Sequence, residues 1–254
     1  MATISPLSDS EKQWLQNFER KLGELHSKEA YNTAFLDPRQ LELAEAALKK
    51  MPSYSYTVYG GYPAAERNVL RVFPAQHQPT LPPLEAVRLS WSGSDEVGHR
   101  DVLGAVMALG LRRDQIGDII VLGDTEAAVI VGETKGDFIM TGLTQAGRTP
   151  VSCDVVEPES LELAKDDGRE IKGTVASLRV DAILSLGFGI SRSRIVLLVK
   201  GGLVRVNWRP ISSPSHQLDE GDQVSLKGRG RILVESVEGE TRKGRMRVKL
   251  KKYG

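Results

Sequence analysis

Basic residues border a short apolar stretch in the last third of the chain, an arrangement typical of sites that bind negatively charged groups. The stretch reads GISRSRIVLLVKGGLVRVNW over residues 189–208 and contains no acidic residue. Its apolar centre is Ile195 to Val199. Four cationic side chains stand around that centre: Arg192, Arg194, Lys200 and Arg205. We expect either an interior carboxylate or an external anion to compensate these charges.

Residues 191–200 are predicted to form a helix, and Ser191 is a natural N-cap for it. Arg192 and Arg194 then lie in the first turn, where a cation opposes the macrodipole at a cost of about 0.3–1 kcal/mol. An external phosphate bound to the free N–H groups would reverse this cost, because the arginines would then contact the phosphate. The alternative is that both arginines extend into water. Of these two interpretations we favour the binding of an external phosphate.

The last predicted strand has one apolar and one basic face. Met246, Val248 and Leu250 share the apolar face. The other face is formed by Arg245, Arg247, Lys249 and Lys251. A solvated strand face normally mixes signs of charge, and no acidic residue occurs among these. This face therefore predicts binding to a phosphate backbone.

A second strand, LVRVNWRP over residues 203–210, alternates in the same way. The alternation groups the polar residues Arg205, Asn207 and Arg209 on one face. The opposite face then holds Val204, Val206 and Trp208. Because Trp208 shares the apolar face, we predict that it packs in the core and does not stack on a base.

The net charge of the 254 residues is +1, but the charges are unevenly distributed. Residues 171–254 hold 17 Lys and Arg against 7 Asp and Glu, whereas residues 1–170 hold 17 against 26. This asymmetry indicates a module that binds polyanions, joined to an acidic body. The alternative is that the two parts neutralise each other by docking.

Other kinds of chemistry find little support in the residues. His99-Arg100-Asp101 matches the first letters of the kinase catalytic loop, but Val106 occupies the position where that loop requires asparagine. The histidines lack metal-ligand spacing and are scattered singly: His26, His77, His99 and His216. The single cysteine, Cys153, cannot form an internal disulfide. We expect no catalytic residue, no cofactor and no metal.

The expected fold class is α+β, beginning with a helical N-terminal domain over residues 1–82. Ser10 with Gln13 fits a capping box for the first helix. Asp37 with Pro38 begins a second helix. Residues 54–74 predict a small strand pair, and a proline-rich segment precedes the next domain.

Residues 83–157 predict the order βαββαβ, which ferredoxin-like and RNA-recognition folds share. The second helix of this domain is predicted to end at Gly147. RNA-recognition domains stack bases on aromatic residues of the central strands. We predict Asp118 to Leu122 and Ala127 to Val131 as those strands, and neither contains an aromatic residue. The domain is therefore interpreted as a scaffold or a weak RNA binder.

An acidic, polar linker over residues 158–170 is predicted to lead to the third domain, residues 171–254. Two short helices, over residues 178–186 and 191–200, precede several short strands there. The segment SLRVDAILSLGFGISRSRIVLLVKGGLVRVNW, followed by LDEGDQVSLKGRGRI, resembles the S-four-like RNA-binding domain. Relatives of that domain occur in bacterial tyrosyl-tRNA synthetases, ribosome-recycling heat-shock proteins and pseudouridine synthases.

The resemblance to the S-four-like domain implies a binding motif. Its opening Arg-Leu-Asp is here Arg179-Val180-Asp181, and most of its members have glycine where this chain has Trp208. The residues that the resemblance assigns to RNA binding are Arg179, Ser191, Arg192, Lys200 and Asn207. The charge argument adds Arg194, Arg205 and Arg209.

Four further segments, VNWRP, AFLDPRQ, GGYPAAER and GHRDVLGAVMALGLRRDQIGDI, resemble the YlmH (RqcP) family, including its branch of photosystem II S-four domain proteins. The resemblance covers nearly the whole chain from about residue 30. It implies an RNA-recognition-like middle domain and a non-enzymatic factor on the large ribosomal subunit. Such a factor contacts ribosomal RNA and peptidyl-tRNA while stalled nascent chains are extended.

No apolar run reaches the roughly 20 residues of a membrane span, and the N-terminus lacks the pattern of a secretory signal. We therefore expect a cytoplasmic protein that binds structured RNA, including rRNA and tRNA, and has no membrane span. Two alternatives remain open. One is an RNA-modifying enzyme of the pseudouridine synthase kind, and the other is an assembly factor for photosynthetic complexes that acts through protein or RNA contacts.

Overall fold

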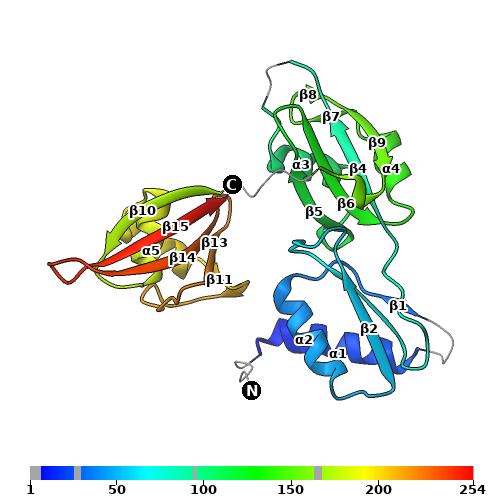
Figure 1. Ribbon diagram of the computed structural model, residues 1–254, viewed down its shortest axis with the longest axis horizontal. Coiled ribbons are helices and arrows are strands. Elements are labelled where there is room, and N and C mark those ends of the chain that lie inside the picture. Colours follow the sequence, from blue (N-terminus) through cyan, green and yellow to red (C-terminus); the bar gives the residue numbers. More distant parts are fainter. Residues whose placement is uncertain (1–6, 26–29, 94–95, 163–167, 254) are drawn as a thin grey trace. The chain divides into compact units, whose positions relative to one another are not determined.

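The chain forms two compact units, Met1–Ala164 and Lys165–Gly254 (Figure 1). The computed structural model describes residues 7–25, 30–93, 96–162 and 168–253. Within these ranges no single helix is long and apolar enough to cross a membrane. The α+β class is confirmed. The boundary predicted between residues 82 and 83 stays a prediction, because both parts lie in the first unit, called here the N-terminal unit.

The N-terminal unit begins with two helices and a small antiparallel sheet in the order β1-β3-β2. The helices are α1 (Asp9–Gly23) and α2 (Pro38–Leu48), and the strands are β1 (Tyr31–Asn32), β2 (Tyr54–Tyr59) and β3 (Val69–Pro74). Apolar side chains from both helices and from β3 share one core, among them Phe18, Leu22, Ala44, Leu48 and Leu70.

The predicted cap of α2 is confirmed, but that of α1 is wrong. Asp37 accepts a hydrogen bond from the backbone of Gln40, whose side chain accepts one in return. In α1 the capping box uses Ser8 and Glu11, two residues before the predicted pair. The two pairs have the same spacing, and an ionised Glu11 in the first turn also suits the positive end of the helix dipole.

Arg39 joins α1 to α2 through a nearly buried ion pair. Its Nε donates to Glu11 Oε1 at 2.7 Å and its Nη1 donates to Glu42 Oε2 at 2.6 Å, while the Arg39 side chain is only 5% exposed. Burial by itself would raise the pKa of the Glu11 carboxyl, but hydrogen bonds from Arg39 and Ser8 lower this pKa to about 2. Because the pKa of Glu11 is lower in the folded than in the unfolded protein, its ionised form stabilises the fold at any pH above the pKa of the unfolded state. This stabilisation is lost as the pH falls through the pKa of the folded state.

Replacing Arg39 with methionine is expected to lower the free energy of unfolding by about 2–3 kcal/mol near neutral pH. The estimate is the cost of breaking a buried ion pair, reduced because the two carboxylates are partly exposed. Urea unfolding followed by tryptophan fluorescence measures the difference. It should shrink as the pH falls from about 4.5 toward 2, where Glu11 becomes protonated in the native protein as well. A difference that does not depend on pH would contradict this role for Glu11.

The second part of the N-terminal unit is a four-stranded antiparallel sheet with two helices on one face. The sheet has the order β5-β6-β4-β9. Its strands are β4 (Leu84–Ser90), β5 (Ile116–Val121), β6 (Glu126–Gly132) and β9 (Ser152–Val156), and its helices are α3 (His99–Ala108) and α4 (Gly136–Gly142). This is the predicted βαββαβ arrangement, in the strand order of ferredoxin-like folds.

Two details of the prediction for this part are wrong. The central strands are β4 and β6, whereas β5 lies at the edge. Helix α4 ends at Gly142, because the next residues form a hairpin of β7 (Gln145–Ala146) and β8 (Thr149–Pro150). Gly147 lies in the turn of that hairpin with φ +61°, a conformation that favours glycine.

A half-buried carboxylate ties the loop before β3 to β5. Asp118 accepts hydrogen bonds from Tyr62 Oη at 2.8 Å, from the backbone N–H of Glu66 at 2.6 Å and from that of Arg67 at 3.2 Å. Burial raises the pKa of Asp118, while these hydrogen bonds and the nearby Arg113 and Arg67 act in the opposite direction. The Arg67 guanidinium donates in turn to the carbonyls of Phe35 and Ile116. The two parts of the N-terminal unit are thus held together by a polar network beside their apolar contacts.

The C-terminal unit is a six-stranded antiparallel sheet in the order β10-β15-β14-β13-β11-β12, packed against two helices. The strands are β10 (Arg169–Val175), β11 (Val204–Val206), β12 (Arg209–Pro210), β13 (Gln223–Leu226), β14 (Gly230–Glu240) and β15 (Met246–Tyr253). The helices are α5 (Val180–Phe188) and α6 (Arg192–Lys200). They reach the length and composition of a membrane span only together, across a bend of 117°.

Two boundaries in this region differ from the prediction. Helix α5 begins and ends two residues later than expected, with Arg179 at its N-cap. Arg169 and Glu170, which were predicted to end the linker, begin strand β10. Residues 163–167 of the predicted linker lie outside the described residues, as does His26.

Candidate nucleic-acid interface

Helix α6 presents the cations of the stretch 189–208 to solvent. Ile195 and Val199 are buried in the core of the C-terminal unit, one helical turn apart. The opposite side of the helix leaves Leu197 68% exposed. The cationic residues of the helix are all exposed: Arg192, Arg194 and Lys200. The apolar residues of this stretch therefore anchor the helix, and the basic residues face outward.

The first turn of α6 has no acidic residue and no side-chain cap. Ser191 occupies the N-cap position as predicted, but its Oγ lies 3.2 Å from Ser193 Oγ and does not bond to the helix backbone. In the described part of the chain, no carboxylate pairs with Arg192, Arg194, Lys200 or Arg205. An interior counter-charge among the described residues is thus excluded, and the free N–H groups and cations are available to an external anion.

Arg179 is placed at the start of α5 by a carboxylate of the same helix. Its Nε and Nη2 each donate to a carboxylate oxygen of Asp181 at 3.1 Å, and Asp181 is 6% exposed. The Arg179 side chain remains 39% exposed. It can contact an anion with its outer edge, but part of its charge is already compensated.

Asn207 forms the turn between β11 and β12. Its Nδ2 donates to Asp222 Oδ1 at 2.8 Å, and its Oδ1 accepts from the backbone N–H of Gln223 at 2.9 Å. Asn207 and Trp208 both have positive φ, +47° and +64°. Two such residues form the tight hairpin turn that usually takes Asn-Gly. The side chain of Asn207 therefore stabilises the turn, and its assignment to RNA binding stays a prediction.

Trp208 does not extend strand β11. The strand ends at Val206, so the predicted alternation of Val204, Val206 and Trp208 breaks at the turn. Val204 and Val206 belong to the core of the C-terminal unit, whereas Trp208 does not. The prediction that Trp208 packs in this core is wrong. A bulky residue with positive φ is strained, where glycine would be relaxed.

The basic face of β15 is partly neutralised. Lys249 Nζ lies 2.8 Å from Glu170 Oε2 on β10 and 3.0 Å from Glu235 Oε2 on β14. These two hydrogen-bonded carboxylates raise the pKa of Lys249. Arg245 donates to the backbone carbonyl of Thr174 at 2.6 Å. The interpretation of this face as wholly basic is therefore wrong, because carboxylates of the neighbouring strands form ion pairs on it.

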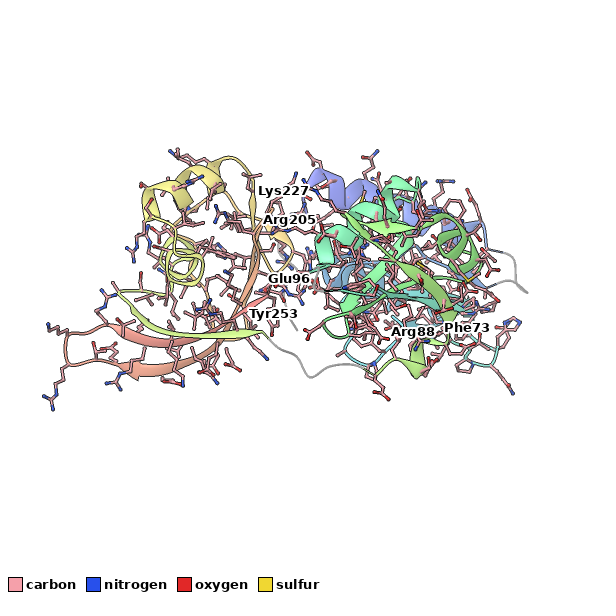
Figure 2. The ribbon with its side chains drawn as sticks, turned by 90° about the horizontal axis from the view of Figure 1, so that it is seen from above. Phe73, Arg88, Glu96, Arg205, Lys227 and Tyr253 are labelled. Atoms are coloured by element: carbon pink, nitrogen blue, oxygen red, sulfur yellow. The ribbon has the colours of Figure 1, made fainter. Side chains whose placement is uncertain are left out.

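Strand pairing adds to the predicted residues Arg205 and Lys251 a basic residue that the sequence pattern did not indicate, Arg231. One row across four strands contains Arg205, Ser225, Arg231 and Tyr253. The Arg231 guanidinium lies 4.9 Å from the centroid of the Tyr253 ring, and Lys251 Nζ lies 5.8 Å from it. Arg205 and Tyr253 are labelled in Figure 2. Only the register of β11, β13, β14 and β15 brings these residues together.

Most of the predicted site residues thus lie on two different parts of the C-terminal unit, helix α6 with the strand after it and the face of the sheet that includes β15. Arg192, Arg194, Lys200 and Ser191 gather on α6, and Arg205 lies on the strand that follows. Lys251 shares the sheet face of Arg231, Arg247 is exposed on β15, and Arg209 begins β12. Among the described residues, no group of three or more His, Cys, Asp or Glu side chains could hold a metal ion.

Two family models match the chain. The model described as "S4 domain" matches residues 178–224, which include α5, α6 and the β11–β12 turn. The model described as "Putative RNA-binding domain in YlmH" matches residues 95–160, which include α3, α4 and three strands of the ferredoxin-like sheet. Both of these models describe RNA-binding domains, which supports an RNA-binding role for the chain.

A curated relative and a solved structure extend the match. The "Ribosome-associated protein quality control protein P2" of Bacillus subtilis (strain 168) is 35% identical over 219 residues, which are 85% of this chain and 84% of the relative. The structure of the "Cell division protein ylmH from Streptococcus pneumoniae" shares the fold with a TM-score of 0.53 at 21% identity. It covers 64% of this chain and 100% of that chain.

Proposed function

This chain belongs to the YlmH family, and on that premise we propose that it is a non-catalytic factor that binds structured RNA. The RNA is ribosomal RNA together with tRNA on the large ribosomal subunit, and the process is ribosome-associated quality control in the cytoplasm. The B. subtilis relative carries the name of that process. Chemically, the site offers cations and free N–H groups, which bind phosphate and require no cofactor.

The observation that carries this proposal is the first turn of α6. Arg192 and Arg194 stand at a helix end that already favours anions, and no described carboxylate compensates them. The two guanidinium groups of this turn, two residues apart in the helix, and the free backbone N–H groups of the same turn can bind the oxygens of one or two phosphates. Lys200 at the other end of the helix and Arg205 beyond it extend the charged surface. Phosphate contacts of this kind position a protein on RNA without reading its sequence.

Binding to the large ribosomal subunit is expected to weaken steeply with salt. If four cations each neutralise one phosphate, the slope of log K against log salt is about −3 to −4. Affinity then falls by about 100-fold between roughly 50 and 200 mM salt. Co-sedimentation with purified large and small subunits at stepped salt concentrations measures both the slope and the choice of subunit. Binding that is insensitive to salt, or equal for both subunits, would contradict the proposal.

Two further measurements separate the remaining alternatives. A protein partner, such as a component of a photosynthetic complex, would stay bound after nuclease treatment, whereas an RNA partner is released. An RNA-modifying enzyme would leave altered nucleosides in the recovered RNA, which mass spectrometry detects. We expect release by nuclease and unaltered RNA.

A further inference from the structure

In the second part of the N-terminal unit, the four-stranded sheet is covered by other residues on the face where RNA-recognition domains stack bases. Ala86 on β4 and Ala128 and Ile130 on β6 point to this face from the two central strands, and all three are 0% exposed. Phe35 and Val69, from the first part of the N-terminal unit, pack against Ala86 and Ile130. RNA that binds this domain must therefore use another surface than the centre of the sheet.

A cavity of about 440 Å³ opens on the helical side of the same domain. It lies between α3, the end of α4 and the β7–β8 hairpin. Its polar lining consists of Arg100, Asp101, Thr144 and Gln145. Every lining residue falls within residues 95–160, the segment matched by the YlmH RNA-binding model.

Small residues keep this cavity open. The floor includes Ala105 and Ala108 on α3 and the backbone of Gly104, Gly142 and Gly147. Gly104 lies inside helix α3, where glycine destabilises a helix relative to alanine. A Cβ added at Gly104 would meet no atom within 4 Å, so packing within the domain does not require glycine there. The close approach of a ligand would account for it.

The lining has the chemistry of a nucleotide site. The Gln145 amide and the Thr144 hydroxyl can donate to and accept from the edge of a base, and the Arg100 guanidinium can bind a phosphate. The apolar floor of Ala105, Ala108 and Leu109 suits the flat face of a base. The volume falls within the range of about 300–1,000 Å³ that is usual for small-ligand sites.

We propose that this α3–hairpin pocket binds one unpaired nucleotide of the RNA. The inference rests on the proposed function and adds a second contact point to it, on the N-terminal unit. The phosphate contacts of α6 are indifferent to sequence, whereas a base held in this pocket would give the protein a preference for a particular single-stranded position.

The test measures binding of the full chain to a short single-stranded RNA oligonucleotide by fluorescence anisotropy, with mixed free mononucleotides as a second probe. Gly104→Leu fills the pocket and is expected to lower affinity for the oligonucleotide by about 5- to 100-fold, the size of one lost base contact. The melting temperature should not fall, because leucine is the better helix former. Met107→Leu is the matched control, since Met107 lies on the same helix, is 42% exposed and does not line the pocket. Its affinity should stay within about twofold.

Gln145→Ala is a second pocket variant, and it changes no helical residue because Gln145 lies in β7. We expect it to weaken binding of the oligonucleotide as well. Normal oligonucleotide binding by both pocket variants would overturn the pocket proposal, as would a response of free mononucleotides alone. The proposed function has a separate indicator, the double substitution Arg192→Glu with Arg194→Glu. If that variant loses RNA binding while Gly104→Leu and Gln145→Ala do not, the proposed function stands and the pocket proposal fails.

Discussion

Replacing both Arg192 and Arg194 with glutamate is expected to lower RNA affinity by at least about 100-fold. Each arginine is expected to make a charge-assisted hydrogen bond to phosphate, worth about 1.5–3 kcal/mol, and each glutamate adds repulsion. The fold should be unharmed, because both side chains are exposed. Acidic residues in a first helical turn even favour the helix by a few tenths of a kcal/mol. A gel-shift or filter-binding assay measures the affinity, and circular dichroism with thermal unfolding monitors the fold.

A matched control separates the position of these charges from their number. Arg242 and Lys243 are exposed in the turn between β14 and β15, away from α6 in the chain. Changing both to glutamate alters the net charge by the same amount. We expect this control to lose only a fewfold in affinity, through the long-range field. Equal losses in the two double variants would show that net charge alone drives binding, and the phosphate site at α6 would be abandoned.

Replacing Asp118 with alanine is expected to lower the free energy of unfolding of the N-terminal unit by about 3–5 kcal/mol. Three donors, Tyr62 Oη and the backbone N–H groups of Glu66 and Arg67, would lose their acceptor at a half-buried position. The guanidinium groups of Arg67 and Arg113 would also lose the carboxylate that offsets their charge. Thermal and urea unfolding measure the loss.

Asp124 provides the control for this prediction. It is exposed in the turn between β5 and β6, in the same part of the unit, so Asp124→Ala should change stability by less than about 0.5 kcal/mol. Asp118→Asn keeps one acceptor oxygen, which can still accept from Tyr62 Oη and the Glu66 N–H but not from the Arg67 N–H, and it should cost less than Asp118→Ala. If Asp118→Ala proves as mild as Asp124→Ala, the network does not hold the two parts of the unit together.

Local patterns in the sequence determined most of the elements. Asp37 with Pro38 predicted the start of α2, and Ser191 predicted the start of α6, because caps depend on residues within one helical turn. Alternating and helical spacings predicted the βαββαβ order, which the sheet order confirms. The same locality explains the error at α1, where two serines offered equivalent capping boxes. The basic first turn of α6 was visible for the same reason, since it lies within a few consecutive residues.

The tertiary structure decided which charges stay uncompensated. Lys249 looked unpaired in its own strand, but its partners Glu170 and Glu235 lie on the two strands that flank it. Strand register likewise groups Arg231 with Tyr253. No periodicity within one strand contains this information, because it depends on which strands pair and in what alignment.

The same holds for surfaces built from distant segments. The closed face of the ferredoxin-like sheet depends on Phe35, about fifty residues before its partner Ala86 in the sequence. The α3–hairpin pocket needs the end of α4 and a hairpin that the sequence pattern predicted as helix. The sequence alone therefore determined the elements and the basic character of α6. The tertiary structure decided which faces stay open, because burial depends on contacts between segments that no local pattern records.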